Sequence, residues 1–168
     1  MLTCQKHLFS LPEDITYLNC AYMSPMLNAV EAAGIKGIQA KKNPTGVSPS
    51  DFFDPLNKIR EGFSQIIDNP EPNRICIIPS ASYGMGIVAR NLQLEPGDNV
   101  IVAGDQFPSN VYPWLSLEDP NAVQVTYIPA PESATHRGKM WNEQILDAID
   151  TATKMVTLGH IHWADGTI

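Results

Sequence analysis

Strand-length apolar segments alternate with segments of helical periodicity from about residue 50 onward, and this alternation leaves few possible folds. Strands joined through helices run parallel, and a parallel sheet must be covered on both faces. The sequence therefore predicts an α/β protein with a three-layer α/β/α arrangement and a mostly parallel sheet. The strands are expected at 74–78, 99–103, 123–128 and 155–158, and the helices at 82–92, at 109–117 with an interruption at Pro113, and from a cap at Asn142.

The N-terminal third follows a different pattern. Residues 1–27 are expected to be irregular because Pro12 and Pro25 break regular structure. A helix is predicted to start at Asn28, which stands three residues before Glu31 at capping-box spacing, and to end near residue 42. A second, amphipathic helix is predicted after residue 54, with a proline in its first turn.

Composition excludes several classes of partner. The formal net charge of −7, without a basic run, argues against binding to nucleic acid or to an anionic membrane. The apolar segments are too short to span a bilayer, and the N-terminus does not resemble a secretory signal. Three cysteines without C-x-x-C spacing fit a reducing cytoplasm, and Cys76 is expected to be buried in its strand. We therefore expect a cytoplasmic protein.

Polar loops follow or join the predicted strands at 79–82, 105–110 and 160–166, where ligands bind in open α/β sheets. Ser80, Ala81 and Ser82 open a helix, and small residues at a helix N-terminus suit a phosphate, although simple capping by serine also explains them. Phe107 is placed to stack on a planar heterocycle, or else to fill the core beneath its loop.

The third loop carries His160, His162 and Asp165, which are possible zinc ligands. No second cluster of histidine or cysteine supports a metal site, so a metal-dependent hydrolase is an alternative interpretation and no metal is expected. A third interpretation is a non-catalytic phosphate-binding α/β module that is complete at 168 residues.

Five segments together resemble a known family. They are residues 17–25 (YLNCAYMSP), 79–84 (PSASYG), 97–102 (GDNVIV), 107–110 (FPSN) with 113–114 (PW), and 160–167 (HIHWADGT). In the order and spacing of these segments, the chain resembles the N-terminal portion of enzymes of the class V aminotransferase family. These are fold-type-I enzymes that use pyridoxal 5'-phosphate (PLP). Cysteine desulfurases, kynureninases and isopenicillin N epimerase-like proteins belong to that group.

The resemblance implies roles for individual residues. The backbone at Ala81 and Ser82, with a nearby hydroxyl, would hold the PLP phosphate, and Phe107 would lie on the pyridine ring. His162 or Trp163 would lie near the phenolic oxygen of the cofactor, although relatives have an asparagine where this chain has the tryptophan. The full set of implied cofactor-binding residues is Ser80, Ala81, Ser82, Phe107, Asn110, His162 and Trp163; Asn19 and Tyr22 would lie near the active site of a dimer.

The resemblance also implies what the 168 residues lack. The Schiff-base lysine and the aspartate that pairs with the pyridine nitrogen are expected beyond Ile168, so no catalytic residue is assigned and the fragment alone should be inactive. Lys139 and Lys154 are expected to be solvated. Residues 1–50 would form an N-terminal arm with the first helix, and 51–168 a truncated PLP-binding large domain. The complete enzyme would be a homodimer acting on an amino acid.

Overall fold

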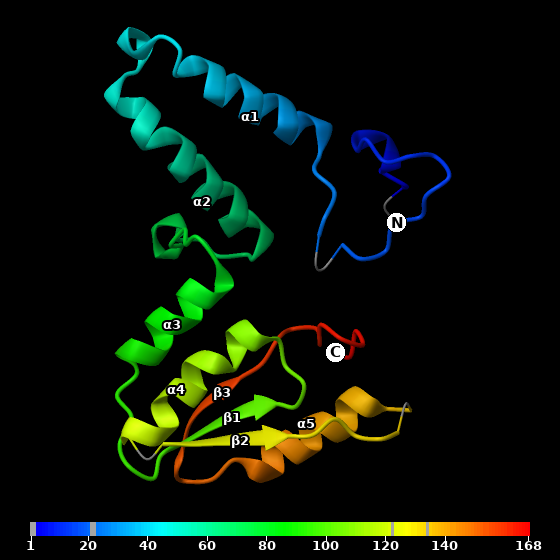
Figure 1. Cartoon of the computed structure of the whole chain (residues 1–168), viewed down its shortest axis with the longest axis vertical. Coiled ribbons are helices and arrows are strands. Elements are labelled where there is room, and N and C mark those ends of the chain that lie inside the picture. The colour runs from blue at the N-terminus through cyan, green and yellow to red at the C-terminus, as the bar shows by residue number, and fades with distance from the viewer. Residues whose placement is uncertain (1–2, 21–22, 122, 134) are drawn as a thin grey trace. The chain divides into compact units, whose positions relative to one another are not determined.

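The computed structural model describes residues 3–20, 23–121, 123–133 and 135–168. Tyr22, to which the resemblance gives a place near the active site, lies outside these residues. The chain forms two compact units, Met1–Ile77 and Ile78–Ile168, and each is described by itself (Figure 1). The sequence-based division after residue 50 concerns the domains of a whole enzyme and stays a prediction.

The first unit is built mainly from two helices, α1 (Asn28–Ala40) and α2 (Asp54–Ile66). Among its described residues only Ser64 is buried, and its hydroxyl donates to the Asn69 carbonyl over 2.7 Å. The apolar stripe of α2 is present as predicted but exposed within the unit. The shorter elements are the 3₁₀ turns Lys6–Leu8, Pro44–Gly46, Pro49–Phe52 and Pro72–Arg74.

The start of α1 corrects one detail of the prediction. Asn28 is the first helical residue rather than the cap, because Leu27 occupies the cap position with extended backbone. The Asn28 side chain instead accepts a hydrogen bond of 2.7 Å from the Ser10 hydroxyl. A capping box does form in this unit, but at Ser48 and Asp51.

The second unit contains the predicted sheet. Its strands β1 (Asn99–Ala103), β2 (Gln124–Ile128) and β3 (Thr153–Thr157) are all parallel and stand in the order β2-β1-β3. Helix α3 (Ala81–Asn91) precedes β1, a 3₁₀ turn (Pro108–Asn110) and α4 (Tyr112–Asn121) join β1 to β2, and α5 (Arg137–Ala148) joins β2 to β3. The alternating pattern is thus confirmed as parallel α/β topology.

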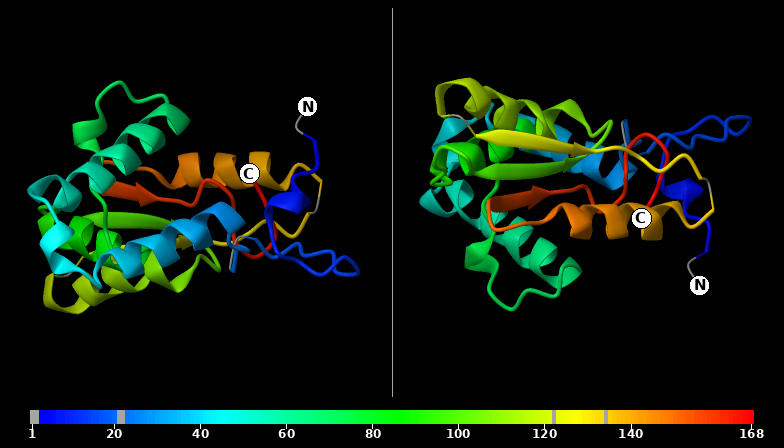
Figure 2. Two further views of the ribbon diagram at one scale, coloured as in Figure 1. Left: turned by 90° about the horizontal axis from the view of Figure 1, so that it is seen from above. Right: turned by 90° about the horizontal axis from the view of Figure 1, so that it is seen from below.

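Alternation along β1 divides the core into two layers. Val100 and Val102 point to one face, where they pack with buried residues of α3 and α4, and Ile101 and Ala103 point to the other, towards α5. Figure 2 shows α4 and α5 on opposite faces of the sheet. The three-layer α/β/α prediction is therefore confirmed. The buried partners are Ala89, Trp114 and Val123 on the first face, and Ile128, Trp141 and Ile145 on the second.

The predicted strand at 74–78 is wrong for this structure. A strand needs a neighbour for its backbone hydrogen bonds, and no described strand pairs with this segment, which leaves a 3₁₀ turn and runs on extended but unpaired. Its side chains consequently stay open to solvent: Ile77 is 43% exposed, and Cys76 is exposed rather than buried as expected.

Two helix predictions also need correction. Pro113 does not interrupt a helix, because it lies in the first turn of α4, where a missing N–H removes no intrahelical bond. Asn142 does not cap a helix either. It lies inside α5, which begins five residues earlier, after His136 turns the chain with a φ of 57°. Within the described residues, none of the helices combines the length and apolar character needed to cross a bilayer.

Candidate functional site

The carboxyl end of β1 leads into a tightly packed turn. Gly104 donates its N–H to the Ile128 carbonyl over 2.7 Å, and a Cβ at Gly104 would lie only 3.1 Å from that oxygen and from Pro129 Cα. Glycine therefore permits the segments after β1 and β2 to meet. Asp105 follows with a φ of 50°, which redirects the chain towards Phe107.

The segments after β1 and β3 meet through two aromatic rings. The rings of Phe107 and Trp163 lie edge to face, with centroids 5.4 Å apart and planes at 89°. The Trp163 indole N–H donates to the Asp105 carbonyl over 2.7 Å. Phe107 remains 40% exposed, so part of its ring is open to a ligand.

Helix α3 presents its N-terminus to the same region. Ser80 caps the helix, since its Oγ accepts from the Tyr83 N–H over 3.1 Å, as the capping interpretation predicted. The N–H groups of Ala81 and Ser82 fall in the first turn, where a helix offers them no acceptor. Ser82 and Phe107 line one open cavity of about 600 Å³ between α3 and the segment that contains α4. Ser82, in the first turn of α3, and the aromatic ring of Phe107 thus border a common space.

Asn110 and His162, two further predicted site residues, use their polar groups within the protein. Asn110 Oδ1 accepts from the hydroxyl of Thr157 over 2.6 Å, which ties the 3₁₀ turn to the end of β3. His162 is 7% exposed, with Nδ1 3.1 Å from Asp165 Oδ1 and Nε2 3.2 Å from the Gly104 carbonyl. Both residues therefore hold strand-end segments together.

Asp165 is held by several hydrogen bonds and an ion pair, and its pKa is lowered. Its Oδ1 accepts the Thr167 N–H over 3.0 Å, and its Oδ2 is paired with the Arg137 guanidinium. The Thr167 backbone N–H is the main cause that lowers the pKa of Asp165 to about 2; partial burial opposes it, and the Thr167 side chain and His162 add to it. The carboxyl group is therefore ionised at neutral pH.

This lowered pKa predicts how stability responds to acid. Asp165 binds a proton less readily in the folded than in the unfolded chain, so its contribution is present above the ordinary value of 3.8 and disappears as the pH falls towards about 2. Because the carboxylate is partly exposed, we expect that contribution to be about 1–2 kcal/mol. Denaturant unfolding of the wild type and of Asp165→Asn should give free energies that converge between these pH values. Parallel pH curves for the two proteins would contradict the assignment.

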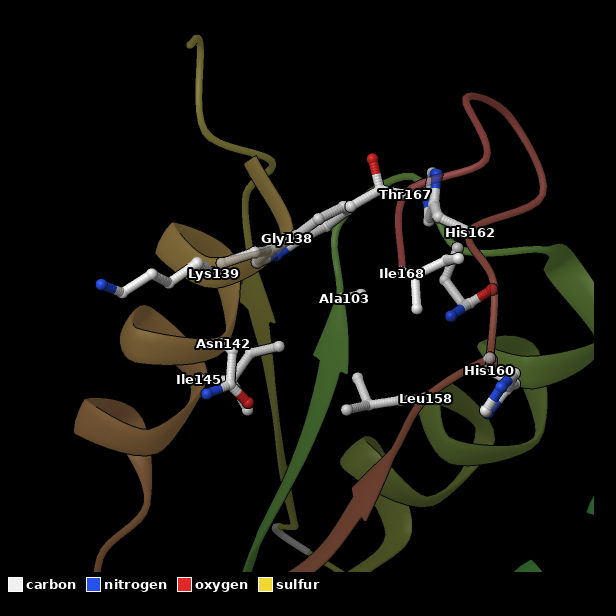
Figure 3. A pocket seen from close by; sticks show the side chains of 13 residues that line it. Ala103, Gly138, Lys139, Asn142, Ile145, Leu158, His160, His162, Thr167 and Ile168 are labelled. Carbon is white, nitrogen blue, oxygen red and sulfur yellow. The ribbon is translucent and has the colours of Figure 1, made fainter. Parts of the chain in front are cut away.

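A metal site built from His160, His162 and Asp165 receives no support. Among the residues that the structure describes, no three or more histidine, cysteine or acidic side chains are grouped to hold a metal ion. His160 is exposed, while both ring nitrogens of His162 already face protein oxygens. His160 and His162 instead border a second cavity of about 380 Å³, between α5 and the segment after β3, with Gly138 and Lys139 on its opposite side (Figure 3).

The sequence of this chain is similar to those of known proteins. The sequence pattern of the family described as "Aminotransferase class-V" matches residues 43–168. A protein named "Probable cysteine desulfurase" from Methanothermobacter thermautotrophicus is 34% identical over 113 residues, which cover 67% of this chain and 27% of that protein. A cysteine desulfurase from Pectobacterium atrosepticum is 22% identical over 116 residues, which cover 67% of this chain and 28% of that protein.

Solved structures agree. The crystal structure of the cysteine desulfurase CsdA from Escherichia coli matches with a TM-score of 0.75 at 20% identity, over 96% of this chain and 41% of that one. A mutant of C-DES with glycine covalently linked to its PLP cofactor matches with a TM-score of 0.77 at 18% identity, over 99% of this chain and 43% of that one. The second unit thus has the fold of part of the large domain of a PLP enzyme.

The chain belongs to the class V aminotransferase family. The match of the family pattern over residues 43–168 and the 34% identity to the Methanothermobacter protein carry this assignment. The family uses PLP. The chain spans less than half the length of the relatives and structures that it matches, from 27% to 43% in the four cases above.

Some residues of this region were not foreseen from the sequence. Arg137 joins two strand-end segments although nothing in its surroundings in the sequence marks it. Trp141 is buried, and its indole N–H donates to the Ile128 carbonyl over 2.9 Å while its ring lies 5.0 Å from that of His162. A tryptophan four residues before Ile145 on one helical face was the available signal for Trp141; Arg137 offered none.

Proposed function

We propose that this chain forms the first part of the cofactor site of a PLP-dependent enzyme that acts on an amino acid. The observation that carries the proposal is the cavity that Ser82 and Phe107 share, beside the contact of Phe107 with Trp163. Ser82 and Phe107 are distant in sequence, and in this proposal they offer a helix N-terminus to an anion and an exposed aromatic ring to a planar group in the same cavity. PLP is a ligand with a phosphate and a planar ring.

The residues present fit the two ends of the cofactor. The N–H groups of Ala81 and Ser82 would bind the phosphate at the positive end of α3, with the Ser82 hydroxyl as a further donor. Ser80 would act through its cap, which fixes the first turn. Phe107 would hold the plane of the pyridine ring. PLP, when bound, supplies the electron sink for chemistry at the amino-acid carbon.

In the proposed site, Asn110, His162 and Trp163 hold the strand-end segments in position around the cofactor. Each uses a polar group within the protein: Asn110 accepts from Thr157, His162 faces Asp165 and Gly104, and Trp163 donates to Asp105. In this proposal they hold the segments on the ring-binding side of the cavity in place.

The remainder of the enzyme is part of the same proposal. The reactive lysine and the aspartate for the pyridine nitrogen would come from sequence outside these 168 residues. This is in keeping with the chain spanning only part of the length of its relatives. We do not propose Lys139 or Lys154 for this role; their ammonium groups lie 3.9 Å from a Glu143 carboxylate oxygen and 3.6 Å from one of Asp98. We further propose a homodimer in the cytoplasm, with residues 51–168 in its large domain. The names of the relatives make cysteine the first substrate to test.

The experiment is spectroscopic. The protein at its full natural length, purified and supplied with PLP, should absorb visible light through lysine-bound cofactor, and borohydride should abolish that absorbance. A colourless protein that binds no added PLP would overturn the proposal. Sulfide release from cysteine is a separate measurement, which tests the substrate and not the cofactor.

A negative charge introduced at the N-terminus of α3 tests whether the phosphate binds there. Ser82→Asp should weaken PLP binding about tenfold or more, because a carboxylate repels the phosphate where the helix otherwise attracts it. Thr151→Asp is the matched control, since it adds the same charge at an exposed turn and should leave the dissociation constant unchanged. Equal affinities for the two variants would place the phosphate elsewhere.

A further inference from the structure

We propose that Arg137, Asp165 and His162 form a positioning network that fixes Trp163, and through it the ring of Phe107. The inference rests on the proposed function, because it assigns the network a role in holding the ring-binding side of the PLP site. The contacts of the network lie within this chain and do not involve a cofactor.

The network begins with Arg137, at the start of α5. Its Nε donates to the Pro131 carbonyl over 3.0 Å, in the segment that follows β2. Its Nη1 pairs with Asp165 Oδ2, in the segment that follows β3. The planar guanidinium holds two partners in fixed directions, which a lysine does not do. Arg137 therefore ties the end of β2 to the end of β3.

His162 continues the connection to β1. Its Nδ1 lies against Asp165 and its Nε2 against the Gly104 carbonyl, at the first residue after β1. Trp141, from α5, packs against the imidazole ring and keeps it 7% exposed. One continuous set of polar contacts thus links the carboxyl ends of all three strands.

The network ends at the aromatic pair. Trp163 follows His162 directly, so fixing the histidine fixes the backbone from which the indole projects. The indole N–H then donates to Asp105, and the ring edge meets Phe107 at 89°. Phe107 is therefore held in one orientation before a ligand binds, and a ring held in advance costs less entropy on binding.

Charge explains why the network is sensitive to one substitution. Arg137 and Asp165 are 31% and 29% exposed in their side chains, so each is partly removed from water and depends on its partner. Asp165→Asn removes the charge that Arg137 and His162 share. Asp147→Asn, on the exposed face of α5, removes the same charge without touching the network, and is the matched control.

The primary test is the indole N–H resonance of Trp163 in an ¹⁵N NMR spectrum of the full-length protein, identified by its loss in Trp163→Phe. In Asp165→Asn this resonance should shift and exchange with solvent at least about tenfold faster, since the backbone that carries the indole is no longer held in place. PLP affinity should fall about tenfold. Asp147→Asn should change neither. An unchanged Trp163 resonance and PLP affinity in folded Asp165→Asn would overturn the network.

A second variant covers the case in which Asp165→Asn does not fold. Arg137→Lys keeps the positive charge but loses the two fixed directions, so it should fold and leave the indole resonance of Trp141 unchanged. The indole resonance of Trp163 should still shift and exchange faster with solvent. If Trp163 is unaffected here, the proposal fails. Should the wild type bind no PLP at all, the proposed function fails, while the cofactor-free NMR comparison still decides the network.

Discussion

Replacing Trp114 with alanine is expected to lower the free energy of unfolding by about 3–5 kcal/mol, the range found when large aromatic side chains are removed from cores. Trp114 has no solvent exposure and packs with Ala89, Val100 and Val102 between the helices and the sheet. Its loss would leave a cavity on the face of β1 that α3 and α4 cover. Denaturant unfolding followed by circular dichroism measures the change.

Two further variants sharpen this prediction. Trp114 Nε1 is buried and has no hydrogen-bond partner among the described residues, so Trp114→Phe loses volume but no hydrogen bond and should cost clearly less than alanine. Tyr112→Ala, on the same helix but 66% exposed, should cost less than about 1 kcal/mol. A similar loss for the alanine variants at 112 and 114 would show that α4 does not pack on the sheet as described.

Phe107→Ala is expected to weaken PLP binding about ten- to a hundredfold, because stacking of an aromatic side chain on a planar heterocycle contributes about 1–3 kcal/mol. The variant removes the 40% exposed ring that borders the cavity and leaves the helix N-terminus intact. The dissociation constant of PLP, measured from the absorbance of the bound cofactor, gives the effect.

The controls for Phe107 separate stacking from general damage. Phe107→His keeps a flat ring and should recover part of the affinity that alanine loses. Phe52→Ala removes a phenylalanine that is 66% exposed in the other unit and should leave PLP affinity unchanged. Wild-type affinity in Phe107→Ala would remove the ring from the proposed site.

Much of the fold was predictable from residue patterns. β1 was predicted with its observed bounds, since a short β-branched segment between polar turns has few other uses. The segment at 74–78 has the same composition and forms no strand, because an apolar pattern reports a tendency towards burial but does not supply the neighbouring strand. Asn142 failed as a cap because α5 begins five residues earlier, after the turn at His136.

The candidate site was predictable only in part. The meeting of the segments around Phe107 and Trp163 follows from their places after β1 and β3, whereas Ser82 follows no strand in the structure. The polar pairings do not follow, since Arg137 and Asp165 are 28 positions apart and their contact depends on how α5 and the segment after β3 fold back. The order of residues in the sequence predicts which side chains lie at the carboxyl edge of the sheet. Which of these side chains pair with one another is decided by how the segments pack.

The strand order β2-β1-β3 has a consequence for synthesis on the ribosome. The central strand emerges before both of its neighbours, so β2 and then β3 each find an existing edge on which to dock. Two-sided burial of β1 penalises a slip by one residue, because a slip would turn Val100 and Ile101 towards the wrong helices. We therefore expect β2 and then β3 to add to β1 as the chain emerges, with the two-sided burial of β1 setting their register.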